Sequence, residues 1–193
     1  VKRLLKIFNA KIHLVNKDLI SIYEISDKIM LKERIYNANP SKCKLKFDAN
    51  KKIAQEIFRQ NSRVDTIICP VNNGSHIIGI SNLKKKYNIF GSYTFSKYAS
   101  SINSFSRREG DLIIKKKINN YKNLIEVFSS DLKKSTNLLY DEGVIPEPAS
   151  ASTISLITKI KSKRKINNIC CVITGTGLKN INNFFFLKNI RKK

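Results

Sequence analysis

Several features that would place a chain in a specialised class are missing from this sequence. No stretch approaches the roughly 18 consecutive apolar residues that a membrane-spanning helix needs, and the amino terminus lacks the charged, apolar and small-residue pattern of a secretory signal. The four cysteines show no Cys-x-x-Cys spacing, and only His13 and His76 could join them in a metal site. We therefore expect a cytoplasmic protein with no membrane contact, no metal and buried free thiols.

Acidic residues are also scarce, because 14 aspartates and glutamates stand against 37 lysines and arginines, which gives a net charge of +23. Such a charge ordinarily indicates a nucleic-acid partner. Lysine, however, occurs 29 times against 8 arginines, and isoleucine 29 times against 7 alanines, a profile that codons rich in A and T would produce. A selected RNA-binding surface would use arginine and exposed aromatics. We interpret runs such as Lys84–Lys86 and Lys115–Lys117 as solvated surface and expect no specific nucleic-acid partner.

The pattern of apolar residues indicates the fold class. A length of 193 residues with 41% hydrophobic residues is sufficient for a buried core. Apolar spacing predicts helices over 1–8, 18–32, 48–60, 77–86, 130–142 and 149–160. Short apolar runs predict strands over 11–15, 66–70, 89–95 and 168–174. Strands that alternate with helices indicate a three-layer α/β architecture, with a mostly parallel sheet flanked by helices.

Helix ends and one irregular segment complete this pattern. Asp48 is a candidate cap for the third helix, and Ser130 or Asp131 for the fifth. Gly143 is suited to end the fifth helix. The segment 97–121 is polar and basic without a clear period, so we expect loop and irregular helix there.

Two loops are placed for ligand binding, since ligands of parallel sheets lie beyond the carboxyl ends of the strands. Residues 72–76 follow the predicted strand 66–70 and precede a helix, so their backbone N–H groups either hold an anion or form an ordinary turn. Thr174 ends the last predicted strand, where its hydroxyl either faces a ligand or satisfies a local backbone group. Glu147, between two prolines, is a carboxylate on a rigid turn or a solvated loop residue.

Three segments in this order resemble the threonine synthase family. Pro70-Val-Asn-Asn-Gly-Ser-His76 is similar to the family's phosphate loop, Pro-Val-Gly-Asn-Ala/Gly-Gly-Asn. Glu142-Gly143 with Glu147-Pro-Ala-Ser-Ala-Ser152 matches Glu-Gly-x-x-x-Glu-Pro-Ala-Ser-Ala-Ala, and Thr174-Gly-Thr-Gly-Leu-Lys-Asn180 matches Thr-Gly-x-Gly-Leu-Lys-Asp. Weaker similarity covers residues 2–15 and Asn39-Pro40. The two carboxy-terminal motifs are the specific ones, because other enzymes of this fold usually end in a different glycine-rich pattern.

The resemblance implies a pyridoxal 5′-phosphate (PLP) enzyme of fold type II, with residues 1–36 as the end of a small domain and 37–193 as a large cofactor-binding domain. The residues that would hold the cofactor phosphate are Asn72, Asn73, Gly74, Ser75 and His76. Thr174 would be the partner of the pyridine nitrogen, and Lys42 would meet the substrate phosphate. The substrate would be O-phospho-L-homoserine, converted with water into L-threonine and phosphate, and the protein could be a homodimer.

The sequence departs from the family at both phosphate segments. Asn72 and Ser75 replace glycines of the cofactor loop, and His76 replaces its last asparagine. Serine adopts positive φ poorly, and added side chains limit the approach of a phosphate, so we expect weakened PLP binding. At the substrate segment Tyr36 replaces an asparagine, and Lys42 replaces an arginine and so loses its bidentate fork.

The family's Ser-Phe-Lys-Asp motif, whose lysine forms the Schiff base with PLP, does not occur in this sequence. The family places that motif upstream of the segment that residues 1–15 resemble. Because the mechanism needs this lysine as anchor and proton carrier, we expect the chain to be the carboxy-terminal part of a threonine synthase and inactive alone. The alternatives are a non-catalytic remnant or basic RNA-associating module, and another PLP lyase such as threonine or serine dehydratase.

Overall fold

The computed structural model describes residues 2–17, 19–40, 43–83, 87–102, 123–161 and 166–180. The chain divides into two compact units, Val1–Cys43 and Lys44–Lys193, and each is described by itself. Of the segment 97–121 the structure describes only η1 (Lys97–Ile102), and both lysine runs lie outside the described residues. In the described part of the chain, no helix has both the length and the apolar character that a membrane crossing requires.

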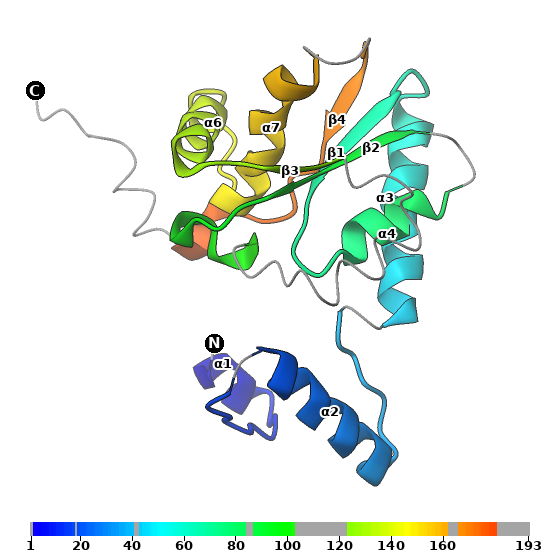
Figure 1. Ribbon diagram of the computed structural model, residues 1–193, viewed down its shortest axis with the longest axis vertical. Coiled ribbons are helices and arrows are strands. Elements are labelled where there is room, and N and C mark those ends of the chain that lie inside the picture. Colours follow the sequence, from blue (N-terminus) through cyan, green and yellow to red (C-terminus); the bar gives the residue numbers. More distant parts are fainter. Residues whose placement is uncertain are drawn as a thin grey trace, which may run out of the picture. The chain divides into compact units, whose positions relative to one another are not determined.

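The first unit consists of two helices with irregular chain between them. α1 (Lys2–Ile7) and α2 (Leu19–Glu33) confirm the predicted helices 1–8 and 18–32 (Figure 1). Asn9 follows α1 in the left-handed conformation (φ 52°), which asparagine adopts more readily than most residues. The strand predicted at 11–15 is wrong. A strand is stable only when its backbone pairs with a neighbour, and among the described residues no strand pairs with this segment.

The second unit is built on a parallel sheet with the strand order β3-β2-β1-β4 within the described residues. The strands are β1 (Thr66–Pro70), β2 (Asn88–Tyr93), β3 (Leu124–Glu126) and β4 (Ile169–Cys171). β1 pairs with both β2 and β4, and Ile68 lies opposite Phe90 on one side and Cys171 on the other. The chain therefore adds β2 and β3 on one edge of β1 and then returns to its other edge for β4.

The predicted strand 66–70 is confirmed with its bounds unchanged, and the predicted strands 89–95 and 168–174 are present with changed ends. β4 is shorter than predicted because residues after Val172 leave the sheet toward α7 (Pro148–Lys161). β3 was not predicted, since three residues are too few to show a period.

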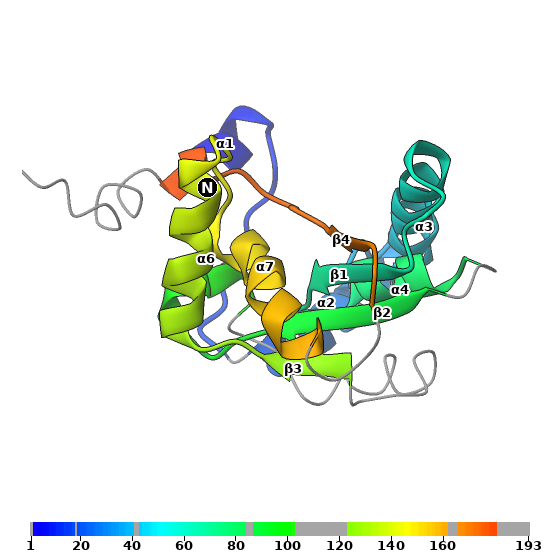
Figure 2. The same cartoon turned by 90° about the horizontal axis from the view of Figure 1, so that it is seen from above.

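Helices cover both faces of the sheet (Figure 2). α3 (Lys44–Gln60) and α4 (Ser75–Ser81) pack on one face, and α6 (Ser129–Asp141) and α7 on the other. Alternate side chains of β1 pack on opposite faces of the sheet: Ile67 and Cys69 belong to the α3–α4 core, whereas Ile68 belongs to the α6–α7 core. This arrangement confirms the predicted three-layer α/β fold.

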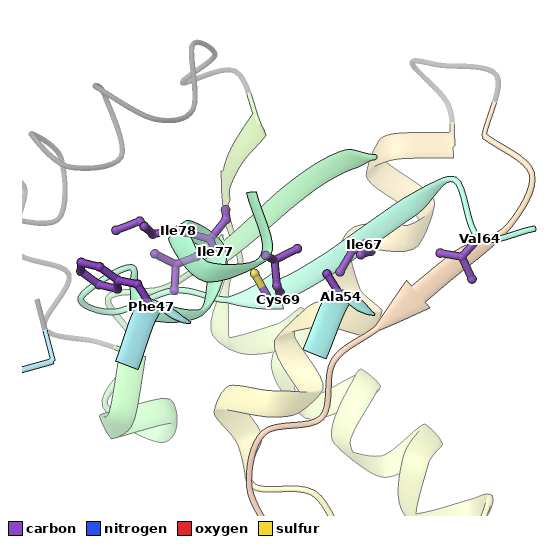
Figure 3. Close-up of a cluster of buried hydrophobic side chains, with 9 residues drawn as sticks. Phe47, Ala54, Val64, Ile67, Cys69, Ile77 and Ile78 are labelled. Atoms are coloured by element: carbon purple, nitrogen blue, oxygen red, sulfur yellow. The ribbon is translucent and has the colours of Figure 1, made fainter. Parts of the chain in front are cut away.

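The α3–α4 core is a continuous apolar cluster (Figure 3). Phe47 and Ala54 of α3 pack with Ile77 and Ile78 of α4 and with β1, and Ala54 and both isoleucines are fully buried. Burying apolar side chains is the main favourable term in folding, so this cluster holds α4, and with it the loop before α4, against the sheet.

Helix boundaries correct two predictions and confirm one. α3 begins at Lys44, so Asp48 lies inside the helix and does not cap it. α6 begins at Ser129, after Phe128, so neither Ser130 nor Asp131 is its cap. Gly143 ends α6 as predicted, because it takes a left-handed conformation (φ 77°) and donates its N–H to the Tyr140 carbonyl at 3.0 Å.

Gly79 allows the close approach of α3 and α4. A β carbon at this position would lie 2.4 Å from Asn50 Cβ and 2.7 Å from the Phe47 carbonyl oxygen, and backbone atoms cannot easily move away. We predict that Gly79→Ala lowers the free energy of unfolding by about 1–3 kcal/mol or more, as overpacking does. Urea unfolding would measure the change. The control is Gln55→Ala on the exposed side of α3, which should change stability by less than about 0.5 kcal/mol; equal effects would contradict the packing argument.

Candidate functional site

The candidate site lies where the strand order reverses, at the carboxyl ends of β1 and β4. The chain leaving β1 enters α4 on one face of the sheet, whereas the chain leaving β4 runs toward α7 on the other face. Neighbouring loops that diverge in this way leave room for a ligand between them, which is why ligands of open α/β sheets bind at such points. Both predicted segments, residues 72–76 and Thr174, follow these two strands.

The loop 72–76 is a tight connection between β1 and α4. Gly74 takes a left-handed conformation (φ 80°), and the Ser75 N–H donates to Asn73 Oδ1 at 3.3 Å. Asn72 and Ser75 are not among the described residues with positive φ, so these replacements of glycine bring no backbone strain of the kind expected from serine. A phosphate here would bind to backbone N–H groups of a turn that leads into a helix.

His76 is half-buried at the start of α4. Burial lowers the pKa of its imidazole below the ordinary value of 6.5, because the charged form loses hydration. At neutral pH His76 is therefore uncharged, as is the asparagine that it replaces in the family pattern. Since residues 72–76 include no other ionisable side chain, the loop offers an anion neutral donors only.

Thr174 is exposed, and the chain around it is held by Ser150 in the first turn of α7. Ser150 Oγ accepts hydrogen bonds from the N–H groups of Thr174 (3.1 Å) and Gly175 (3.0 Å) and lies 3.1 Å from Thr174 Oγ1. Ser150 is completely buried. A second buried hydroxyl pair, Ser92 with Ser152 at 2.6 Å, joins β2 to the same turn of α7.

Glu147 also belongs to this region and is buried rather than solvated, with 7% of its surface exposed. Its N–H donates to the Gly175 carbonyl at 3.0 Å, and its Oε1 accepts from Ser101 Oγ at 3.1 Å. Pro146 pairs with Thr176 in an antiparallel bridge. The two carboxy-terminal motifs of the resemblance are therefore in direct contact.

Burial also determines the chemistry of the thiols beside the site. The pKa of Cys69 and that of Cys171 are each raised to about 12 by desolvation, so both thiols are protonated and unreactive at neutral pH. All four cysteines are free. Among the residues that the structure describes, no three His, Cys, Asp or Glu side chains gather in a way that could hold a metal ion.

The structure thus brings residues 72–76 and Thr174 to the same end of the sheet, where β1 and β4 terminate. Lys42 lies outside the described residues. Ser150 was not predicted as a site residue. Its position inside the Glu-Pro-Ala-Ser motif was the available signal, but the pattern alone does not show which member of the motif reaches β4.

Residues 1–175 match the family described as pyridoxal-phosphate dependent enzyme. Because the match extends over most of the chain, the chain belongs to that family, and the cofactor of the family is PLP. Comparison with curated protein sequences gave no match.

Solved structures with the same fold include enzymes of several activities. Serine racemase from maize superposes with a TM-score of 0.73 at 15% identity, covering 96% of this chain and 66% of that one. The processed form of threonine deaminase isoform 2 from Solanum lycopersicum gives 0.74 at 15% identity, covering 97% and 59%. Cysteine synthase from Entamoeba histolytica gives 0.75 at 16%, covering 100% and 62%. The chain thus spans less than two-thirds of the length of each of these three proteins.

Two glycines of the last motif are required by contacts with the Glu-Pro turn. A β carbon on Gly175 would lie 2.9 Å from Glu147 Cδ, and one on Gly177 would lie 2.7 Å from the Pro146 carbonyl oxygen. We predict that both alanine variants are destabilised by about 1–3 kcal/mol, with Gly177→Ala the more severe, because a side chain can shift more easily than a backbone carbonyl. Denaturant unfolding of the two variants would test this order, and the reverse order would contradict it.

The low pKa of His76 predicts an acid dependence of stability. The unfolded chain takes up a proton near pH 6.5, whereas the folded chain resists protonation, so the free energy of unfolding should decrease as the pH falls from 7 to 5. His76→Asn removes this titration, and its decrease should be smaller. Urea unfolding at the two pH values measures the difference. Equal decreases in both proteins would show that His76 does not contribute.

Proposed function

We propose that this chain is the cofactor-binding part of a threonine synthase, which converts O-phospho-L-homoserine and water into L-threonine and phosphate. Family membership supports a PLP enzyme, and the finer assignment depends on one observation. The motifs Glu147-Pro-Ala-Ser and Thr174-Gly-Thr-Gly form a single contact set in which Ser150 holds the end of β4 and both glycines are packed against the Glu-Pro turn. This contact favours the threonine synthase family, in whose sequences both carboxy-terminal motifs occur.

The residues of the site have separate tasks in this proposal. Backbone N–H groups of residues 72–76 bind the cofactor phosphate without an ion pair, and Thr174 contacts the ring nitrogen. When bound, PLP withdraws electrons from an attached amino acid, which permits phosphate to leave from the γ carbon and water to add at the β carbon. Lys42 pairs with the phosphate of the substrate. A lysine outside this chain anchors the cofactor.

Another PLP lyase, such as a threonine or serine dehydratase, is the second candidate. The specific observation in its favour is the structural similarity to a threonine deaminase. The two activities differ in their products, because a dehydratase releases ammonia and a 2-oxo acid, whereas threonine synthase releases phosphate.

The reading frame that contains this chain should be expressed and purified, and its products measured with O-phosphohomoserine, threonine and serine in turn. We predict release of phosphate and formation of threonine from the first substrate. Thr174→Val, which removes the hydroxyl, should lower kcat/KM by about tenfold or more. Ammonia and a 2-oxo acid from threonine or serine would instead support the dehydratase.

The matched control is Thr158→Val, which makes the same change at an exposed threonine near the other end of α7 and should keep full activity. Restored growth of a threonine auxotroph that lacks threonine synthase provides an independent readout. Soluble protein that forms none of these products would overturn the catalytic proposal and favour a non-catalytic remnant.

A further inference from the structure

The hydroxyl group of Ser150 is the centre of the hydrogen-bond network at the end of β4. It has three polar neighbours in the described part of the chain: the N–H groups of Thr174 and Gly175 and the hydroxyl of Thr174. Ser150 is 0% exposed, so water does not complete its bonding. Its proton and its lone pairs must therefore be matched by protein groups.

Counting these groups determines the direction of the hydroxyl–hydroxyl bond. A serine hydroxyl has one proton and two acceptor lone pairs. The two amides can only donate, and they occupy both lone pairs of Ser150 Oγ. In the contact of 3.1 Å with Thr174 Oγ1, Ser150 must then be the donor and Thr174 the acceptor. The proton of the Thr174 hydroxyl consequently points away from Ser150.

We propose that Ser150 is a positioning residue that orients the hydroxyl of Thr174 toward the ring nitrogen of PLP. The inference rests on the proposed function, because it takes Thr174 to contact that nitrogen. Thr174 is exposed, so its outward proton is accessible to a ligand. The bond from Ser150 occupies one lone pair of Thr174 Oγ1 and leaves the proton and the second lone pair for a ligand. The bond from Ser150 thus restricts the directions that the proton of the Thr174 hydroxyl can take.

The test compares PLP with 1-deazapyridoxal 5′-phosphate, in which a C–H group replaces the ring nitrogen. Dissociation constants are measured by absorbance for the full chain and its variants. The wild type should prefer PLP by about fivefold, the effect of one hydrogen bond. Thr174→Val should abolish this preference, and Ser150→Ala should lose most of it, because Thr174 then has no fixed orientation. A merely structural role of Ser150 would weaken both ligands equally and leave their ratio unchanged.

Ser155→Ala is the matched control. Ser155 is also a buried serine of α7 with two hydrogen bonds, to Ser135 Oγ (2.6 Å) and to the Asp131 carbonyl (3.2 Å), but it faces α6. This variant should keep the preference for PLP. If Ser150→Ala does not fold, Ser150→Cys provides a similar shape with a weak donor and should give an intermediate preference.

Hydrogen exchange tests the network without any ligand. The amide protons of Thr174 and Gly175 should exchange about fivefold faster in Ser150→Ala than in the wild type, and at an unchanged rate in Ser155→Ala. Unchanged exchange in Ser150→Ala would overturn the network itself. A wild-type preference for PLP that persists in Ser150→Ala would overturn the positioning role while PLP binding stands. Failure of the wild type to bind either compound would overturn the role of Thr174 toward the cofactor.

Discussion

The arrangement of the sheet and of both helical layers in the second unit depends on β1. This strand is paired along both edges and buried along its whole length. A strand in this position satisfies its backbone groups through its neighbours and presents alternate side chains to the two helical layers. Only its ends are available for other interactions. Because β2 and β4 lie on opposite sides of β1, the chains at its carboxyl end diverge, and the position of the candidate site follows from the strand order.

The carboxy-terminal motifs have a structural explanation that is independent of any ligand. Ser150 and Thr174 are separated by 24 residues, yet the serine hydroxyl replaces the strand neighbour that the backbone beyond β4 has lost. Glycine occurs at 175 and 177 because Glu147 and Pro146 occupy the space that β carbons would need. Residue types that resemble a cofactor-binding signature are thus required first by the packing of α7 against β4, and Thr174 is among the motif's exposed members.

The layers, the central strand and the ends of several helices could be predicted because local rules determine them. The apolar run 66–70 and the left-handed Gly143 are such cases. The strand predicted at 11–15 failed because alternation of side chains does not supply a pairing partner. The predicted caps of α3 and α6 were wrong because each helix begins before the polar residue that was expected to cap it. Ser150 was missed for a related reason, since its partners are distant in the sequence.

The charge of the candidate phosphate loop differs from that of the whole chain. The net charge is +23, but residues 72–76 are uncharged at neutral pH, because burial keeps His76 neutral and the other side chains cannot ionise. A phosphate bound there would interact with fixed dipoles, which act at short range and impose geometry, whereas dispersed lysines attract any polyanion and impose none. Composition therefore says little about what this protein recognises. At the proposed site, selectivity would come from the few oriented polar groups at the ends of β1 and β4, among them the hydroxyl of Thr174.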